Sequence, residues 1–364
     1  MSLTTDFLSF IASPSTIDQF SLAQQHILIR GARKAGLLAS IAIQLQQDEA
    51  CWRTLDEGIR RHLHSALIYS QRQHQQIRHE MNLLQTILVP TPFRCYFLKG
   101  AGYVVRGDNI HGGRIMSDID VLVERRHLNN VEALLKQHRW VGKQVSDYDD
   151  KYYREWAHEI PPMLNVERNT TLDLHHNLVP PVSNRMPDAS WFTQDAIAIS
   201  DNIYVLRPAA TLLHSAVHLI MNEEFHHGLR DLADIHKMLL AYDGDAFWDD
   251  LLSLARQAKF QQELLYTLQL HAQIWPTTTN AKTVISQLQQ DVTSPSHGFW
   301  LQAYRWAIVP EIEELDSVKS RAARFLCFLR GHSQKMPLPI LIRHLSFKTY
   351  LQFKQKVLGQ QPQV

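Results

Sequence analysis

The spacing of hydrophobic residues changes twice along this chain and divides it into three parts. Up to about residue 90, apolar residues recur every three or four positions, as in amphipathic helices. The longest such pattern, Arg60 to Leu88, ends at Val89-Pro90-Thr91-Pro92, because proline removes a backbone donor and restricts its predecessor. Short apolar and β-branched runs follow, and helical spacing returns after Arg207-Pro208. The sequence therefore predicts an α+β fold with an N-terminal helical region (1–90), a mixed core with a small sheet (91–206) and a C-terminal helical domain (207–364).

Within the mixed core, Tyr96–Leu98 and Ile119–Val123 have the composition of buried strands. The runs Met163–Glu167 and Thr171–His176 flank Arg168-Asn169-Thr170, which predicts a hairpin. Further helices are expected over Leu128–His138, Leu229–Leu240, Phe247–Lys259, Glu263–Trp275 and Phe299–Arg330.

Composition excludes several classes of protein. The net charge is only +1, so no overall field attracts nucleic acid or an acidic membrane. No apolar run reaches the roughly 18 residues of a membrane span, and residues 1–6 lack the basic start of a signal peptide. The three cysteines form no Cys-x-x-Cys pair, which argues against a zinc ribbon or a disulfide framework. We expect a cytoplasmic protein with no membrane span.

A stretch near the C-terminus alternates basic and aromatic residues, a pattern that nucleic-acid or membrane-surface binding can produce. We favour an amphipathic helical pair that packs its aromatic residues inward and exposes its charges, so nucleic acid is not an expected partner. The residues are Arg321, Arg324, Phe325, Phe328, Arg330, Lys335, Arg343, Phe347, Lys348, Tyr350, Phe353, Lys354 and Lys356.

The segment Ser117-Asp118-Ile119-Asp120 carries the strongest chemical signal. On a strand, alternate side chains share one face, so Asp118 and Asp120 point the same way. Two carboxylates this close raise each other's pKa unless a cation lies between them. Carboxylates on a rigid strand are ligands that suit Mg²⁺. Such a pair also occurs at strand ends without a metal, so the signal depends on its surroundings.

Several neighbouring residues strengthen the metal hypothesis. Lys99-Gly100 follows a predicted strand, where lysine can meet a phosphate and glycine permits close backbone approach. Arg114 lies four residues before Asp118, near enough to contact the same phosphate as Lys99. Ser117, next to Asp118, is also predicted to bind the nucleotide. A third carboxylate, Asp173, shares a strand face with His175. Three carboxylates on adjacent strands predict a pocket for two divalent ions.

These residues resemble those of a known family. The order Lys-Gly, Arg-x-x-x-Asp-x-Asp and Leu-Asp-Leu-His is similar to the DNA polymerase β-like nucleotidyltransferase superfamily, and within it to the bacterial "uncharacterised nucleotidyltransferase" family. The resemblance extends over roughly residues 95–240 and includes Leu229-Arg230-Asp231-Leu232-Ala233-Asp234. Lys99-Gly100 lies further from Asp118 than the Gly-Ser of the wider superfamily does, and no serine follows Gly100.

The resemblance implies a small mixed sheet with flanking helices, and it implies roles. Asp118 and Asp120 would bind two Mg²⁺ ions, and Asp173 would bind the one that activates the acceptor hydroxyl. Lys99 and Arg114 would contact an NTP, most simply ATP. The reaction would transfer NMP, with AMP favoured, to a hydroxyl acceptor and release pyrophosphate. The acceptor stays open between a small molecule, a peptide and a protein. A non-catalytic nucleotide-binding or protein-interaction module is the alternative, and a kinase-like enzyme is a third reading.

Two further pairs have more than one interpretation. Arg230 and Asp234 lie four apart, which allows a helix ion pair or a helix that closes over the nucleotide. The resemblance favours the second, and both residues are included in the nucleotide-binding set. His214 and His218 have a spacing that can hold zinc, but Ser215 excludes the His-Glu-x-x-His motif, so we expect them in the core or lining a pocket.

Overall fold

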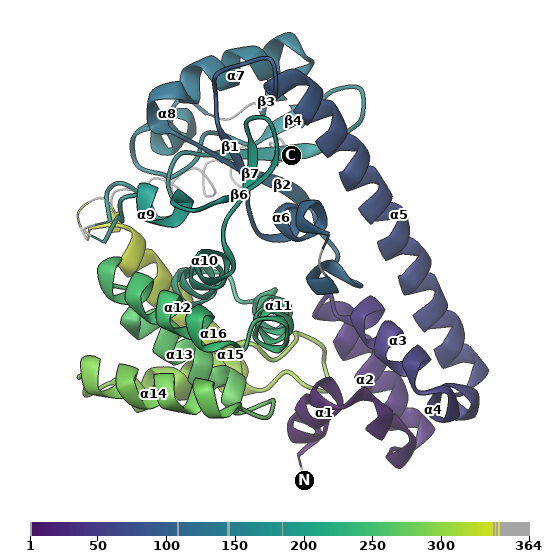
Figure 1. Ribbon diagram of the computed structural model, residues 1–364. Coiled ribbons are helices and arrows are strands. Elements are labelled where there is room, and N and C mark those ends of the chain that lie inside the picture. The colour runs from purple at the N-terminus through teal and green to yellow at the C-terminus, as the bar shows by residue number, and fades with distance from the viewer. Residues whose placement is uncertain are drawn as a thin grey trace, which may run out of the picture.

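The computed structural model describes residues 2–107, 109–143, 146–183, 185–337, 339 and 341–342. Within these residues, one mixed β-sheet lies at the top of the view in Figure 1. The N-terminal helices lie at the lower right and the C-terminal helices at the lower left, with α10 just below the sheet and α11 between the two groups. The fold is α+β with helices flanking the sheet, as the sequence predicted.

The described sheet has seven strands in the order β3-β4-β5-β2-β1-β7-β6. The two predicted strands and the predicted hairpin are confirmed as β1, β2 and the antiparallel pair β4–β5, whereas β3, β6 and β7 were not expected. The central strands β2 and β5 are parallel. The bounds are β1 Cys95–Phe97, β2 Asp118–Val123, β3 Trp140–Gly142, β4 Met163–Asn165, β5 Thr171–His175, β6 Ile197–Ser200 and β7 Ile203–Val205.

Side chains alternate along β2 as its sequence predicts. Ile119, Val121 and Val123 are buried in a hydrophobic cluster with residues of α5, α6 and α7, which we call the sheet core. Leu122 faces the other way and joins a second, larger cluster of helical residues, which we call the helical core. The polar positions Asp118 and Asp120 lie on the face of Leu122, because they are two and four residues from it.

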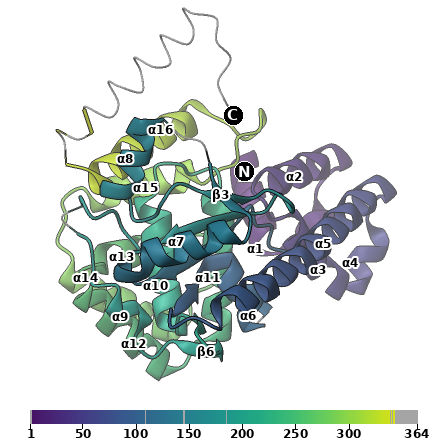
Figure 2. The ribbon, with the colours of Figure 1, turned by 90° about the horizontal axis from the view of Figure 1, so that it is seen from above.

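The N-terminal region is helical up to Leu88, as expected. Its long helix α5 begins after Asp56, whose carboxylate accepts hydrogen bonds from the backbone amides of Gly58 and Ile59. The first half of α5 packs in the helical core and the second half in the sheet core, and Figure 2 shows it running from the N-terminal helices toward α6. The bounds are α1 Leu3–Ala12, the 3₁₀ turn η1 Pro14–Gln19, α2 Leu22–Lys34, α3 Leu38–Gln47, α4 Glu49–Thr54 and α5 Glu57–Leu88.

The remaining helices surround the sheet or follow it. Those of the mixed region are α6 Lys99–Arg106, η2 Asn109–His111, η3 Arg125–His127, α7 Leu128–Gln137, α8 Asp147–Glu155 and α9 Ser190–Thr193. Those of the C-terminal region are α10 Pro208–Met221, α11 Gly228–Ala241, α12 Asp245–Gln257, α13 Gln261–Ala272, α14 Thr279–Asp291, α15 His297–Ala307 and α16 Val318–Lys335.

One helix prediction and one packing prediction are wrong. The expected helix Phe299–Arg330 is two helices, α15 and α16, with Pro310 in the break between them. The aromatic residues of α16 do not all pack inward, since Phe325 is 61% exposed. The second part of this basic and aromatic stretch lies outside the described residues; it contains Arg343, Phe347, Lys348, Tyr350, Phe353, Lys354 and Lys356.

The cysteines and the membrane prediction can also be examined in the described residues. Cys51, Cys95 and Cys327 are buried and unbridged. Of the helices that the structure describes, none combines the length and the apolar content needed to cross a bilayer.

Candidate active site

Lys99 and Gly100 form the sharp passage from β1 into α6. Lys99 adopts a left-handed backbone conformation with φ +41°, and its Nζ lies 3.9 Å from Oδ2 of Asp120. A Cβ on Gly100 would lie 2.3 Å from Nη1 of Arg114 and 2.6 Å from Sδ of Met116. Glycine is therefore what allows the segment before β2 to pack against the start of α6.

The three predicted carboxylates lie on neighbouring strands. Asp120 of β2 is the register partner of Asp173 of β5, and Asp118 precedes Asp120 by two residues on the same face. Paired residues of adjacent parallel strands project from the same side of a sheet, so all three carboxylates face one side. His175 follows Asp173 by two residues, and its Nε2 lies 3.0 Å from Oδ1 of Asp120.

The local environment shifts the pKa values of these three carboxyl groups in different directions. Burial raises the pKa of Asp173 to about 8, and the nearby Glu159 and Asp120 add to this effect. The pKa of Asp118 is also raised, by burial and by Asp120. Burial acts in the same direction on Asp120, but the Lys99 ammonium and the hydrogen bond with His175 outweigh it and hold its pKa below the ordinary value. In the metal-free protein at neutral pH, Asp120 is therefore the ionised member and Asp173 largely carries a proton.

Histidines and Glu159 line the site beside β5. Nε2 of His175 lies 3.4 Å from Oε2 of Glu159. Burial lowers the pKa of His175, but Asp120 and Glu159 together outweigh it, so the net shift is upward. Burial and the Lys99 charge lower the pKa of His218 to about 3, and burial holds the pKa of His158 well below its ordinary value. His158 and His218 are therefore neutral at pH 7.

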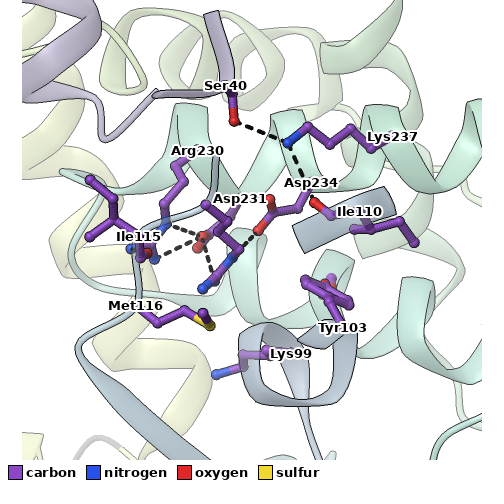
Figure 3. Close-up of polar contacts among 12 residues, drawn as sticks. Ser40, Lys99, Tyr103, Ile110, Ile115, Met116, Arg230, Asp231, Asp234 and Lys237 are labelled. Atoms are coloured by element: carbon purple, nitrogen blue, oxygen red, sulfur yellow. Dashed lines mark hydrogen bonds and ion pairs between the residues drawn. The ribbon is translucent and has the colours of Figure 1, made fainter. Parts of the chain in front are cut away.

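A buried ion-pair network connects this site to α11 (Figure 3). Nε of Arg114 donates to Oδ2 of Asp234 at 2.5 Å, and Arg114 is only 7% exposed. Arg230 donates to Oδ1 of Asp231 at 2.9 Å. The helix ion pair between Arg230 and Asp234 is therefore not what the structure shows, because each residue has another partner.

Lys237 of the same helix fixes the chain that leads to Arg114. Its Nζ donates to the carbonyl oxygens of Gly112 at 2.7 Å and of Ile110 at 3.4 Å, and to Oγ of Ser40 at 3.0 Å. Figure 3 shows Lys237 reaching Ser40 and Ile110 on the side of Asp234 away from Lys99. Helix α11 thus binds both Arg114 and the loop that precedes it, and α3 takes part through the contact between Ser40 and Lys237.

These groups open onto one cavity of about 270 Å³. Its wall contains every predicted site residue except Asp234, which lies behind Arg114. The lining residues are Lys99, Gly100, Arg114, Met116, Ser117, Asp118, Asp120, His158, Glu159, Asp173, His175, Leu178, Val179, Pro180, Val217, His218, Met221, His227, Arg230, Asp231 and Lys335.

Residues 22–276 match the model of a protein family described as "Uncharacterised nucleotidyltransferase". The chain belongs to this family. The match runs from the start of α2 to just beyond α13 and includes the seven described strands. It supports a general role in nucleotidyl transfer, with an NTP as substrate. No curated protein and no solved structure matches the chain.

Several residues that line the cavity were not identified as site residues from the sequence. His158 and Glu159 lie in an irregular segment with no motif, and Lys335 is at the end of α16, far along the chain. Asp231 stands next to Arg230 in the α11 motif, and this neighbouring position was the one available signal. His214 is buried in α10 and His218 lines the cavity, so the expectation for these two histidines is confirmed.

Proposed function

We propose that the protein transfers NMP, with AMP favoured, from an NTP to a hydroxyl acceptor in a Mg²⁺-dependent reaction that releases pyrophosphate. One observation carries this proposal. Asp118, Asp120 and Asp173 face the same cavity from adjacent parallel strands, with the Lys99 ammonium 3.9 Å from Asp120. Carboxylates grouped beside a cation suit a reaction in which positioning and charge neutralisation lower the barrier.

The donor set fits Mg²⁺. The aspartates supply the hard oxygen ligands that this ion prefers. Oδ1 of Asp173 is buried and has no hydrogen-bond partner among the described residues, which is unusual for a buried acceptor and is relieved by a cation. Asp118 and Asp120 would hold two ions, and Asp173 would hold one of them. When bound, Mg²⁺ would neutralise the phosphate charge and lower the pKa of the acceptor hydroxyl.

The protein's own side chains would bind and orient the triphosphate. Lys99, Arg114 and Arg230 are the cations proposed to contact its oxygens, and Ser117 and the backbone at Gly100 border the same space. Asp234 is proposed to act through Arg114, since it lies behind that side chain and bonds to it. This modifies the expectation that Asp234 contacts substrate directly.

Asp173 is the carboxyl group best suited to accept a proton from the acceptor hydroxyl. Its raised pKa of about 8 leaves it largely protonated in the metal-free protein at neutral pH, so it would act as a base only after that proton is lost on Mg²⁺ binding. The apolar wall formed by Leu178, Val217 and Met221 offers a surface for a nucleobase or an acceptor. A small molecule, a peptide and a protein side chain all remain candidate acceptors.

The product formed from ATP tests the proposal. The protein is incubated with ATP, Mg²⁺ and a mixture of small-molecule, peptide and protein hydroxyl acceptors, and the products are separated. Pyrophosphate together with an AMP-modified acceptor supports nucleotidyl transfer, provided that Asp120→Asn abolishes both. ADP would establish a kinase instead, and nucleotide binding without either product would favour the non-catalytic module.

A further inference from the structure

A second group of metal-ligand side chains lies in the same cavity. His158, Glu159 and His175 each offer a nitrogen or oxygen atom, and these three atoms lie within 4.8 Å of one another. Among the residues that the structure describes, this is the one group of three or more His, Cys, Asp or Glu that approach so closely. The three aspartates, although they share a face, do not form such a group.

The backbone holds this group in place. Glu159 forms an isolated antiparallel bridge with His175. The amide of Ile160 donates to the carbonyl of Leu174 at 3.1 Å, and the amide of His176 donates to the carbonyl of His158 at 2.8 Å. The segment carrying His158 and Glu159 is thus hydrogen-bonded along β5, and side chains on such a scaffold keep their spacing.

The spacing fits a tetrahedral metal ion. Nε2 of His175 and Oε2 of Glu159 are 3.4 Å apart. Two ligand atoms about 2.0–2.1 Å from a tetrahedral Zn²⁺ ion are separated by about 3.4 Å. Two imidazoles and one carboxylate are a zinc ligand set, whereas Mg²⁺ prefers oxygen ligands throughout.

An unpaired nitrogen atom points independently to a ligand. Nδ1 of His158 is buried without a hydrogen-bond partner in the described part of the chain. Buried polar atoms are nearly always paired, so an unpaired nitrogen in this cluster requires an explanation. The rings lie together, with centroids 5.2 Å apart, so a single ion can reach both imidazoles.

We propose that His158, Glu159 and His175 bind a Zn²⁺ ion, separate from the Mg²⁺ expected at the aspartates. Three protein ligands leave a fourth position that opens to the cavity, where water or a substrate oxygen binds. Nε2 of His175 also lies 3.0 Å from Oδ1 of Asp120, and a nitrogen that binds zinc has no proton to donate, so zinc binding would replace this hydrogen bond. The proposal concerns binding alone and does not depend on nucleotidyl transfer.

The test is a zinc titration of the full-length protein after chelator treatment. Isothermal titration calorimetry, with a competing chelator of known affinity, gives the zinc dissociation constant. We expect His158→Ala and Glu159→Gln each to weaken zinc binding at least about tenfold, since each removes one of three ligands. His79→Ala, which removes an exposed histidine of α5, is the matched control and should bind as the wild type does.

Asp118→Asn separates the two metal sites. We expect it to keep zinc affinity and to lose Mg²⁺ affinity. If Asp118→Asn weakens zinc binding as much as His158→Ala does, zinc occupies the aspartate site and the proposal is wrong. Unchanged zinc affinity in both His158→Ala and Glu159→Gln would overturn it equally.

X-ray absorption at the zinc edge of the wild-type protein does not depend on how any variant folds. Two imidazole nitrogens in the first shell support the site, and a shell of oxygen atoms alone rejects it. Pyrophosphate release from ATP tests the proposed reaction separately, so either proposal can fail without the other.

Discussion

At the scale of single residues, Asp173 makes stability depend on pH. Its carboxyl titrates near 8 in the folded, metal-free protein against an ordinary value of 3.8. Between these values the native state holds a proton that the unfolded chain has lost. The free energy of unfolding therefore decreases as pH rises through this window, by up to about 1.4 kcal/mol per pH unit. We predict that Asp173→Asn removes this contribution, so that the variant becomes more stable than the wild type as pH rises from about 5 to 8.

Melting temperatures of both proteins, measured in chelator across that pH range, check this prediction. Saturating Mg²⁺ is the control, because the ion stabilises the ionised form of the wild-type carboxyl and should reduce the difference. Parallel melting curves at every pH would show that Asp173 does not carry the raised pKa.

Asp120 should behave in the opposite way. It contacts Lys99 and His175, which hold its pKa below the ordinary value, so its charge is favourable in the native state. We predict that Asp120→Asn lowers the stability of the metal-free protein by about 1–3 kcal/mol and abolishes pyrophosphate release. Urea denaturation beside the product assay measures both. A variant that is more stable than the wild type would mean that carboxylate crowding outweighs the two contacts.

Asp234 is more deeply buried than Arg230, so we predict different effects when each is replaced by alanine. Asp234 is 4% exposed and bonds to buried Arg114, so Asp234→Ala leaves an arginine charge without its closest partner. We expect a loss of about 3–5 kcal/mol together with lost turnover. Arg230 lines the cavity, and Arg230→Ala should mainly raise the KM for the NTP. Thermal melting and steady-state kinetics compare them, and unchanged stability in Asp234→Ala would contradict the positioning role.

At the scale of elements, two glycines test how closely the loop before β2 packs on α3. Gly107 and Gly113 have nearly the same left-handed backbone, with φ +73° and +72°. A Cβ on Gly107 meets nothing within 4 Å, whereas one on Gly113 would lie 2.3 Å from the backbone nitrogen of Ser40. We predict that Gly107→Ala costs about 1–2 kcal/mol and Gly113→Ala about 2–5 kcal/mol.

Urea midpoints of the two variants measure this difference, with Gly107→Ala as the matched control for backbone strain alone. Gly113→Ala should also raise the KM for the NTP, because the displaced loop leads directly to Arg114. Equal midpoints in the two variants would show that α3 yields without cost at this contact.

The limits of sequence reasoning are also visible at this scale. The spacing of hydrophobic residues and the positions of prolines predicted α5, α11 and β2 well, because these signals are local in the sequence. Strands β3, β6 and β7 were missed because they have three or four residues, too few to show a period, and they lack the neighbouring signals that marked β1, which precedes Lys99-Gly100, and β4, which precedes a hairpin turn. The helix α14 was also missed, and Pro310 was passed over inside an otherwise helical pattern.

At the scale of the whole molecule, the site residues that form sequence motifs could be predicted, whereas those that only folding brings to the cavity could not. Asp118, Asp120 and Asp173 were selected because strand alternation is readable in sequence. Glu159 was missed because it reaches the cavity through a backbone bridge to His175. The partner of Arg114 was not predictable either, since Asp234 is 120 residues away along the chain. The cytoplasmic location and the domain boundaries at residues 90 and 206 stay predictions.

The arrangement of the hydrophobic cores leads to a prediction about those boundaries. Buried residues of the N-terminal helices and of the C-terminal helices belong to the same helical core. A Cβ on Gly31 of α2 would lie 2.6 Å from Phe7 and 3.1 Å from Leu315, so the two regions meet there, and Arg30 and Glu314 form an ion pair beside it. Regions that share a core should unfold together.

We therefore predict that Phe7→Ala in α1 and Leu268→Ala in α13 destabilise the same calorimetric transition. Both side chains are almost fully buried in the helical core, and each truncation should cost about 2–5 kcal/mol. Leu84→Ala in the sheet core is the control, since it reports whether the mixed region unfolds separately. If residues 1–90 form an independent domain, Phe7→Ala will shift one transition and leave the transition lowered by Leu268→Ala where it is. A shift of one common transition by both variants would mean that the N-terminal helices and α11 belong to one cooperative folding unit. The hydrogen bond from Lys237 to Ser40 would then make the N-terminal helices contribute to the position of Arg114.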